Sequence, residues 1–388
     1  MTRDLRLIAL SLLIWGFGEG MFIFFQPIYL RQLGADPVAI GGILGLAAAG
    51  MLVSHLPAGA LADHVGRKSL MVAAWVIATI AAGLMALARG LPLFVAGLVL
   101  YSTTVFVMSP MSSYVTQARG SWSPARALTT VTAAFSAGAI LGPVIGGQLG
   151  EQFGLRSVYG LATGIFVLST LLIVLIRPQP VEPAHEGHRY RALLANRRFG
   201  GFLILVFLVN FGMYLPWPLT PNFLHEVRQV TVSQIGLLGA FTGLGVVMFN
   251  LALAHLPAKR GLLIAQALVG GAVVALWVGV GFPWYAAAYL LFAGYRTARS
   301  LITATVHALV NPAEIGLAFG ANETLAAASL MAAAPVAGLL YARQPGLPYP
   351  VGAGLIVLGL LLSAAFAPHT QAELEPEPPS ERGVVGGV

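Results

Sequence analysis

Four ionisable side chains fall well inside long apolar stretches of this 388-residue sequence: Glu19, Arg296, Arg299 and Glu323. Each would cost about 2.5–3.5 kcal/mol at the centre of a lipid bilayer, so we expect them to face a cavity or one another. A carboxyl group that alternates between a dry and a wet environment is suited to carrying a proton. Gly18 and Gly20 leave room around Glu19. We therefore predict proton-coupling roles for Glu19 and Glu323.

The two intramembrane arginines, Arg296 and Arg299, are three residues apart and share one face of a helix. Two interpretations of them stay open. Either Glu323 holds Arg299 in a structural ion pair, or one arginine anchors an anionic group or neutralises an ionised Glu19. Because two acids balance two bases, we expect a site near neutrality whose charge is set by protonation.

Polar and aromatic residues in the same stretches predict a substrate cavity. The stretch from 200 to 224 is interrupted by Pro216, Pro218 and Pro221, and broken helices at membrane depth are tolerated where they line cavities. For Trp217, a position at the lipid interface is the alternative. The predicted cavity residues are Gln26, Asn210, Tyr214, Trp217, Tyr295, Arg296, Arg299 and Asn322.

The composition is that of a membrane protein: 57% of residues are hydrophobic and 9% are charged, whereas soluble domains carry about 25% charged residues. Cysteine is absent, which excludes disulfides, thiolate metal sites and thiol catalysis. The glycines at 16, 18 and 20 lie inside an apolar stretch with no preceding strand, so they predict no nucleotide site. His55, His255 and His307 are too scattered for a metal site. We expect no enzyme activity, no cofactor and no metal.

A helix needs about 20 apolar residues to cross the bilayer, and the chain offers 12 such stretches. We expect an all-α membrane protein with 12 transmembrane helices in two pseudo-symmetric six-helix bundles. The predicted spans are 5–30, 38–62, 69–88, 92–117, 127–149, 157–176, 200–224, 232–255, 262–280, 284–308, 315–341 and 349–367.

Charge placement predicts the orientation. Most of the 21 Lys and Arg residues fall in alternate loops, so both termini are expected on the cytoplasmic side. The net charge of +7 then reflects topology and anionic lipid rather than nucleic acid. The start of the chain lacks a small-residue cleavage site, so we expect a retained first helix. The predicted organisation is a bundle at 1–176, a cytoplasmic linker at 177–198, a second bundle at 199–368 and a disordered tail at 369–388.

The two halves look like copies. Pro27 and Pro221 are separated by half of the 388-residue length, and Phe17 and Phe211 have the same separation. Each half carries six predicted spans, an even number, so both copies have the same orientation. Parallel repeats of this kind occur in transporters with a substrate site at the repeat interface.

The turn between the second and third spans carries Gly59, Asp63, Gly66, Arg67 and Lys68. This spacing resembles the signature of the major facilitator superfamily in the loop between helices 2 and 3. The resemblance covers essentially the whole ordered length, and it implies a gating role for these five residues. It also implies that Asp63 meets the start of the eleventh span, where a helix N-terminus favours an anion.

That turn departs from the family pattern and from its own repeat. His64 stands where the family often has Arg or Lys. In the second half, Lys259 and Arg260 are kept, but His255 replaces the acid. The predicted gating turn therefore carries its acid only in the first half of the chain.

A second match lies in the fifth span, and it resembles the helix 5 motif of the family's antiporter branches. Glycines four apart form a flat ridge on which another helix packs closely, and a proline bends it. An ordinary packing face of small residues is the alternative. The residues of this motif are Gly138, Gly142, Pro143, Gly146 and Gly147.

One feature of many proton-coupled members is missing. Their fourth helix carries a membrane-embedded arginine, whereas the stretch from Leu93 to Ala118 has no acidic or basic residue. This argues against a proton mechanism centred on that helix.

The expected function is proton-coupled export of a small amphipathic solute or drug by alternating access. The alternatives are a facilitator-type importer or a lipid or organic-anion transporter, in which Arg296 and Arg299 anchor the anion. A non-transporting membrane sensor or scaffold is the alternative of another class. Expected partners are a small-molecule substrate, protons and membrane lipids, with no nucleic acid. We expect a monomer in the cytoplasmic membrane of a prokaryote.

Overall fold

The computed structural model describes residues 1–179, 197–253, 255–310 and 315–367. Within these ranges the side chains of 55–64, 197–198, 307–308 and 315–317 are not described. The predicted linker at 177–198 and tail at 369–388 therefore fall largely outside the described residues. Everything that is described is helix, turn or loop, with no strand.

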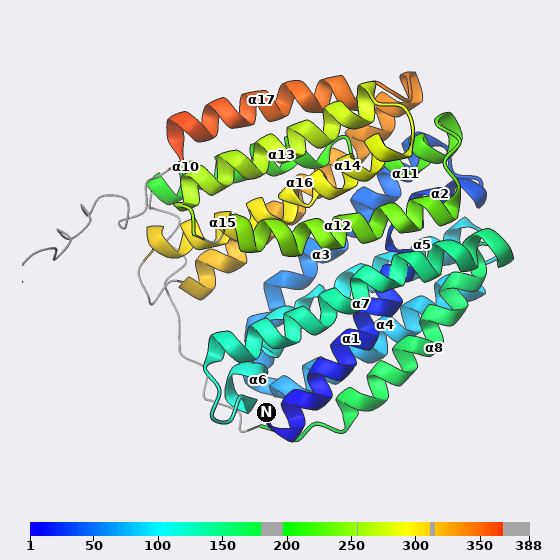
Figure 1. Ribbon diagram of the computed structural model, residues 1–388. Coiled ribbons are helices and arrows are strands. Elements are labelled where there is room, and N and C mark those ends of the chain that lie inside the picture. The colour runs from blue at the N-terminus through cyan, green and yellow to red at the C-terminus, as the bar shows by residue number, and fades with distance from the viewer. Residues whose placement is uncertain (180–196, 254, 311–314, 368–388) are drawn as a thin grey trace, which may run out of the picture.

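The first half of the chain forms one bundle of helices, coloured blue to green in Figure 1. Its elements are α1 (Arg3–Ile23), α2 (Gln26–Gln32), α3 (Pro37–Val65), α4 (Arg67–Leu87), α5 (Leu91–Thr103), the 3₁₀ helix η1 (Thr104–Val107), α6 (Met108–Ala118), α7 (Pro124–Phe153) and α8 (Leu155–Val174).

The second half forms a matching bundle beside it, coloured green to red in Figure 1. Its elements are α10 (Arg197–Tyr214), α11 (Thr220–Asn222), the π-helix η2 (Phe223–Val227), α12 (Val232–Leu253), α13 (Ala258–Val278), α14 (Phe282–Phe292), α15 (Gly294–Leu309), α16 (Ile315–Arg343) and α17 (Pro348–Phe366).

Of the 12 predicted spans, the described residues supply 10 helical segments that are long and apolar enough to cross a membrane. The other two are interrupted. Helix α10 ends at Tyr214, ahead of the prolines at 216 and 218, and α14 gives way to α15 at Ala293. The all-helical membrane architecture is confirmed, whereas 12 uninterrupted helices are not.

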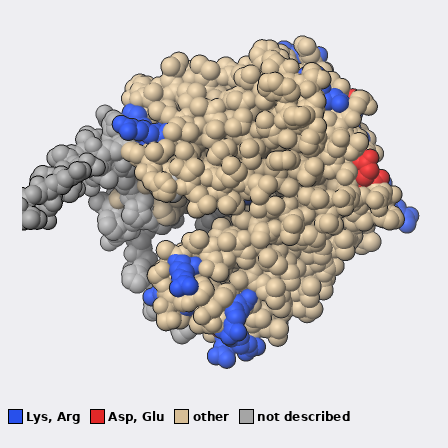
Figure 2. Space-filling model, viewed as in Figure 1, with Lys and Arg blue, Asp and Glu red and all other residues tan. Residues whose placement is uncertain are grey.

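The surface is suited to lipid. Large apolar side chains are exposed along the outer helix faces, including Leu171, Leu251 and Leu361, whose exposed fractions are 59%, 67% and 64%. On the face shown in Figure 2, lysine and arginine lie toward the two ends, and a broad uncharged band separates them. A soluble monomer rarely exposes so continuous an apolar surface.

Local sequence signals set several helix boundaries. The Thr2 hydroxyl accepts a hydrogen bond from the Leu5 amide at 3.2 Å and donates to the Ala118 carbonyl at 2.6 Å, so it caps α1 and ties it to α6. Ser123 caps α7 by accepting from the Arg126 amide at 3.2 Å. Gly66, at the junction of α3 and α4, has φ +86°, a conformation that favours glycine.

Helix α7 positions α1 through the predicted glycine ridge. A Cβ atom at Gly138, Gly142 or Gly146 would overlap main-chain oxygens of α1. On the far side of α1, the Ser11 and Ser169 hydroxyls lie 2.8 Å apart, and the Trp75 indole donates to Ser11 at 3.0 Å. Because α1 is packed backbone to backbone on one side and hydrogen-bonded on the other, the depth and rotation of Glu19 are fixed.

Candidate substrate and proton site

Glu19 lies near the end of α1 as a half-buried side chain at the boundary between the two bundles. The Trp15 indole and the Tyr101 hydroxyl face its carboxyl group, and the charge of Arg296 from the second bundle acts on it. Glu19 of the first bundle and Arg296 of the second bundle are therefore close enough to influence each other, although no ion pair between them is described. The role of this pair in coupling stays a prediction.

Trp15 and Tyr101 belong to an aromatic wall that the sequence reasoning missed. The Trp15 ring stacks on Phe166 at a centroid distance of 4.4 Å, and Tyr101 stacks on the same ring at 5.9 Å. Trp15 carried a usable signal, because it precedes Glu19 by four residues and must share its helical face. Tyr101 carried none, because no spacing relates it to α1.

The predicted aromatic residues of the second bundle do come together. Tyr214 lies 5.9 Å from Tyr295 between ring centroids, and Trp217 stacks on Phe292 at 3.5 Å. Phe292 in turn stacks on Tyr295 at 5.7 Å. The Trp217 ring is thus held against α14 inside the bundle. Phe292 was missed, although it precedes Tyr295 by three residues.

The two arginines of α15 have different surroundings. Arg299 forms an ion pair with Glu323 of α16, as the structural interpretation predicted. Arg296, by contrast, is exposed. Two ion pairs are described in the part of the chain that the structure covers, Arg299–Glu323 and Arg31–Glu226. Of the four intramembrane charges, Glu19 and Arg296 are therefore the two that no described ion pair neutralises.

The predicted amide residues are buried but not assembled around Glu19. Asn210 donates to the Val206 carbonyl of its own helix at 2.9 Å. The side-chain oxygens of Asn210 and Asn322 are both buried without a described hydrogen-bond partner. Gln26 is buried at the start of α2. Gln26 follows Glu19 by seven residues and would share its face in one continuous helix, but the helix is interrupted at residues 24 and 25.

The predicted gating turn is described only in part. Arg67 and Lys68 begin α4, directly after Gly66. Gly59 and Asp63 lie on α3, but their surroundings are outside the described residues. The contact of Asp63 with the eleventh span stays a prediction.

The close helix crossings between the two bundles lie toward the end of the molecule away from the N-terminus. In one of them α3 crosses α16, and a Cβ on Gly41 would approach the Gly338 Cα to 3.0 Å. In the other α7 crosses α12, and a Cβ on Gly147 would approach the Gly236 Cα to 3.1 Å. Pro143 and Gly147 of the predicted antiporter motif thus meet the other bundle, while its remaining glycines pack α1.

Polar contacts also join the two bundles at the end that carries these glycine crossings, which we call the sealed end. The sequence predicted none of these contacts. Arg31, which follows the first span, pairs with Glu226, which follows the seventh, at 3.1 Å between Nε and Oε1. The Tyr341 hydroxyl lies 3.3 Å from the other Glu226 oxygen. The Glu151 carboxylate accepts from the Ser233 amide at the start of α12 at 3.0 Å.

The opposite end, where the N-terminus lies, is the more open one. Figure 2 shows the surface indented between the two bundles on that side. The exposure of Arg296 and the half-exposure of Glu19 fit a site that solvent reaches from there.

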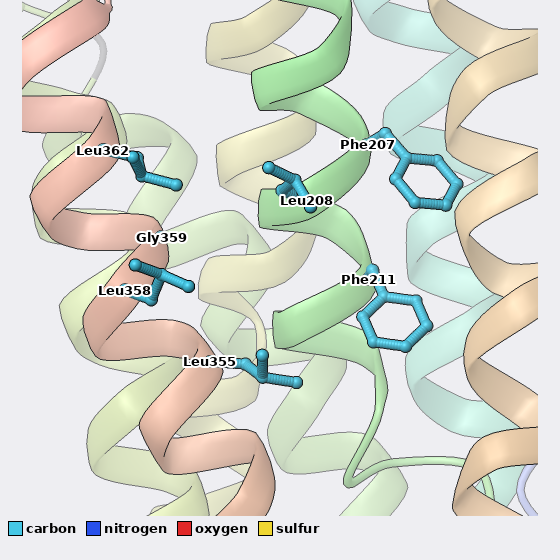
Figure 3. Close-up of a pocket in the computed structure, with 7 residues that line it drawn as sticks. All are labelled: Phe207, Leu208, Phe211, Leu355, Leu358, Gly359 and Leu362. Carbon is cyan, nitrogen blue, oxygen red and sulfur yellow. The ribbon is translucent and has the colours of Figure 1, made fainter.

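An apolar groove on the outside of the second bundle is separate from this site. It has a volume of about 180 Å³ and lies between α10 and α17. Figure 3 shows Leu208 and Leu355 among its side chains, with Phe207 and Phe211 on the flank of α10. No predicted site residue lines it, so it does not belong to the charged cavity.

The family model described as "Major Facilitator Superfamily" matches residues 8–294. Multidrug resistance protein 1 of Bacillus subtilis is 22% identical over 93% of this chain and 96% of its own length. A multidrug resistance efflux pump PmrA homolog of Lactococcus lactis is 27% identical over 61% of this chain, and the chain spans 62% of that relative.

Solved structures show the same fold at low identity. A nucleoside transporter, NupG, superposes with a TM-score of 0.79 at 16% identity, covering 94% of this chain and 99% of that one. The human organic anion transporter MFSD10 superposes with a TM-score of 0.69 at 18% identity, covering 93% of this chain and 99% of that one. The family match, the helical architecture and these structures identify the chain as a multi-pass membrane transport protein that belongs to the major facilitator superfamily.

Proposed function

We propose that the protein is a proton-coupled exporter of small amphipathic solutes that works by alternating access, with its termini in the cytoplasm. The observation that carries the proposal is Glu19, a carboxyl at membrane depth, outside any described ion pair and between the two bundles. The name of the Lactococcus lactis relative, a multidrug resistance efflux pump homolog, supports the direction of transport. The clustering of basic residues in alternate loops supports the orientation.

In this mechanism the described arrangement is inward-facing. Ionised Glu19 and the aromatic walls bind the solute from the cytoplasmic side. The bundles then rock about the site, so that the sealed end opens and the end near the N-terminus closes. A proton from outside neutralises Glu19, weakens its hold on a cationic group of the solute, and returns inward with the carrier. Solute and proton compete for one carboxyl group, which makes the exchange obligatory.

The test is transport in proteoliposomes with an imposed pH gradient and a fluorescent amphipathic amine. Glu19→Gln removes the proton carrier and keeps the shape of the side chain. We expect it to abolish uphill movement while downhill exchange continues. Glu19→Asp is the control, because it keeps a carboxyl group and should retain part of the coupled flux. Full uphill transport by Glu19→Gln would overturn the assignment.

A second candidate, import of an organic anion, is favoured by the exposure of Arg296. Here protonation of Glu19 frees Arg296 to bind the anion, so that the proton and the solute move in the same direction. Arg296→Gln would then abolish uptake, and Glu19→Gln would leave anion binding intact. The two candidates differ in the sign of the pH gradient that drives accumulation.

A further inference from the structure

Among the described residues, the intramembrane charges that lie outside an ion pair are one acid, Glu19, and one base, Arg296, carried on opposite bundles. Glu323 neutralises Arg299 within the second bundle. Glu19 and Arg296 act on each other electrostatically but do not close into an ion pair. A carboxylate on α1 and a guanidinium on α15 therefore act on each other from opposite bundles.

Aromatic rings occur on both bundles near these charges. Trp15 and Tyr101 face Glu19. On α15 the Tyr295 ring lies 5.9 Å from that of Tyr214, and its side chain interacts with Arg299, one turn after Arg296. The walls thus offer apolar surface for a ring or short chain, with a polar anchor of opposite sign at each side.

We propose that this site selects zwitterionic amphipathic solutes, with an ammonium group on Glu19 and an anionic group on Arg296. The inference rests on the proposed function, because it places the solute on the carboxyl that carries the proton. A solute with one charge satisfies one wall and leaves the other charge uncompensated as the cavity dries, which is costly at membrane depth. A zwitterion satisfies both walls, and the filled site stays neutral.

Bridging also explains how the solute would promote the conformational change. A ligand shifts an equilibrium only by its differential affinity for the two states. A zwitterion held by α1 on one side and α15 on the other gains both contacts fully only when the bundles close around it. A solute held by one wall gains little from closure.

The test is a matched ligand series measured by binding to the purified protein in detergent. The probes are 4-phenylbutylamine, 5-phenylpentanoate and 2-amino-5-phenylpentanoate, which share one ring and chain and differ in charge. We expect the zwitterion to bind at least roughly tenfold more tightly than either singly charged probe, the effect of one additional charge-assisted hydrogen bond.

Variants assign the two halves of the recognition. Arg296→Gln should reduce zwitterion affinity to that of the amine, and Glu19→Gln should reduce it to that of the carboxylate. Arg296→Lys keeps the positive charge and should keep the preference, which separates charge from folding. Arg343→Gln is the matched control, because Arg343 is exposed at the far end of α16 and its loss should change nothing.

Equal binding of the amine and the zwitterion to the unmodified protein would overturn the proposal, as would an unchanged preference in Arg296→Gln. Either result leaves the proton-coupling experiment on Glu19 unaffected. Conversely, a zwitterion preference together with uphill transport by Glu19→Gln would remove the coupling role and keep the binding site.

Discussion

At the residue scale, Arg299 and Glu323 form a pair whose value lies in mutual neutralisation. Their side chains are 33% and 37% exposed, so water screens the pair in part. Removing one partner of a buried pair costs about 3–5 kcal/mol; at this exposure we expect Glu323→Gln to cost about 1–2 kcal/mol. The measurement is the thermal unfolding midpoint in detergent, which should fall by several degrees.

The double variant Arg299→Gln with Glu323→Gln is the control for that prediction. It leaves no uncompensated charge, so its midpoint should lie above that of Glu323→Gln alone, and the cycle isolates the pairwise energy. A double variant less stable than both single variants would show that the two residues act independently.

The four intramembrane charges could be found from the sequence, because hydropathy alone makes them anomalous. Their partners could not. The pair of Arg299 with Glu323 was one of two interpretations left open. Which one holds depends on how α15 lies against α16. Tyr101 faces Glu19 only because the fold brings its ring from α5 against Trp15 and Phe22 of α1, a tertiary relation that no sequence spacing carries.

At the scale of elements, the α7 ridge sets how close α1 can lie. A Cβ on Gly142 would overlap the Phe17 oxygen and come within 2.9 Å of the Met21 nitrogen. Because both neighbours are backbone, no side chain can yield. We expect Gly142→Ala to reduce the yield of folded protein and to lower the unfolding midpoint, measured by size-exclusion chromatography and thermal unfolding.

Gly160→Ala on α8 is the matched control for Gly142→Ala. Nothing lies within 4 Å of a Cβ at Gly160, and alanine is the better helix former, so stability should be unchanged or slightly higher. Equal tolerance of both substitutions would show that α1 does not depend on the ridge for its position.

Helix interruptions were predictable where proline causes them and not elsewhere. Pro27 lacks an N–H donor and clashes with a preceding carbonyl, so the end of α1 at Ile23 has a cause in the sequence, although one continuous span was expected there. The prolines after Tyr214 predicted the break of α10 correctly. The change from α14 to α15 at Ala293 has no proline, and the sequence carried no sign of it.

At the scale of the whole molecule, repeat-related segments of the two bundles contact each other at the sealed end. Pro27 and Pro221 are repeat-related, and the Asn222 amide donates to the Pro27 carbonyl at 3.1 Å. The repeat could be recognised from the sequence, because the copies match in position. The sequence does not reveal which end of the two bundles is closed, because the same sequence must allow each end to close in turn during transport.

Arg31 links the bundles at the sealed end through Glu226 and also donates to the Ala35 carbonyl at 3.3 Å. Loss of a half-exposed ion pair is worth about 0–1 kcal/mol, which hardly affects folding. The same free energy matters more for the balance between two conformations that differ by only a few kcal/mol, because it shifts their relative populations directly. We therefore expect Arg31→Gln to increase the fraction of molecules open at this end without lowering the unfolding midpoint.

The natural absence of cysteine makes this shift directly measurable. Spin labels on Phe153→Cys and Val280→Cys would sit on exposed positions of the first and second bundles at the sealed end, and pulsed electron resonance would report the distance between them. Arg31→Gln should add a longer-distance population, and Arg343→Gln, an exposed arginine at the same end, should not. An unchanged distance distribution in Arg31→Gln would mean that the glycine crossings of α3 with α16 and of α7 with α12 hold the seal by packing alone.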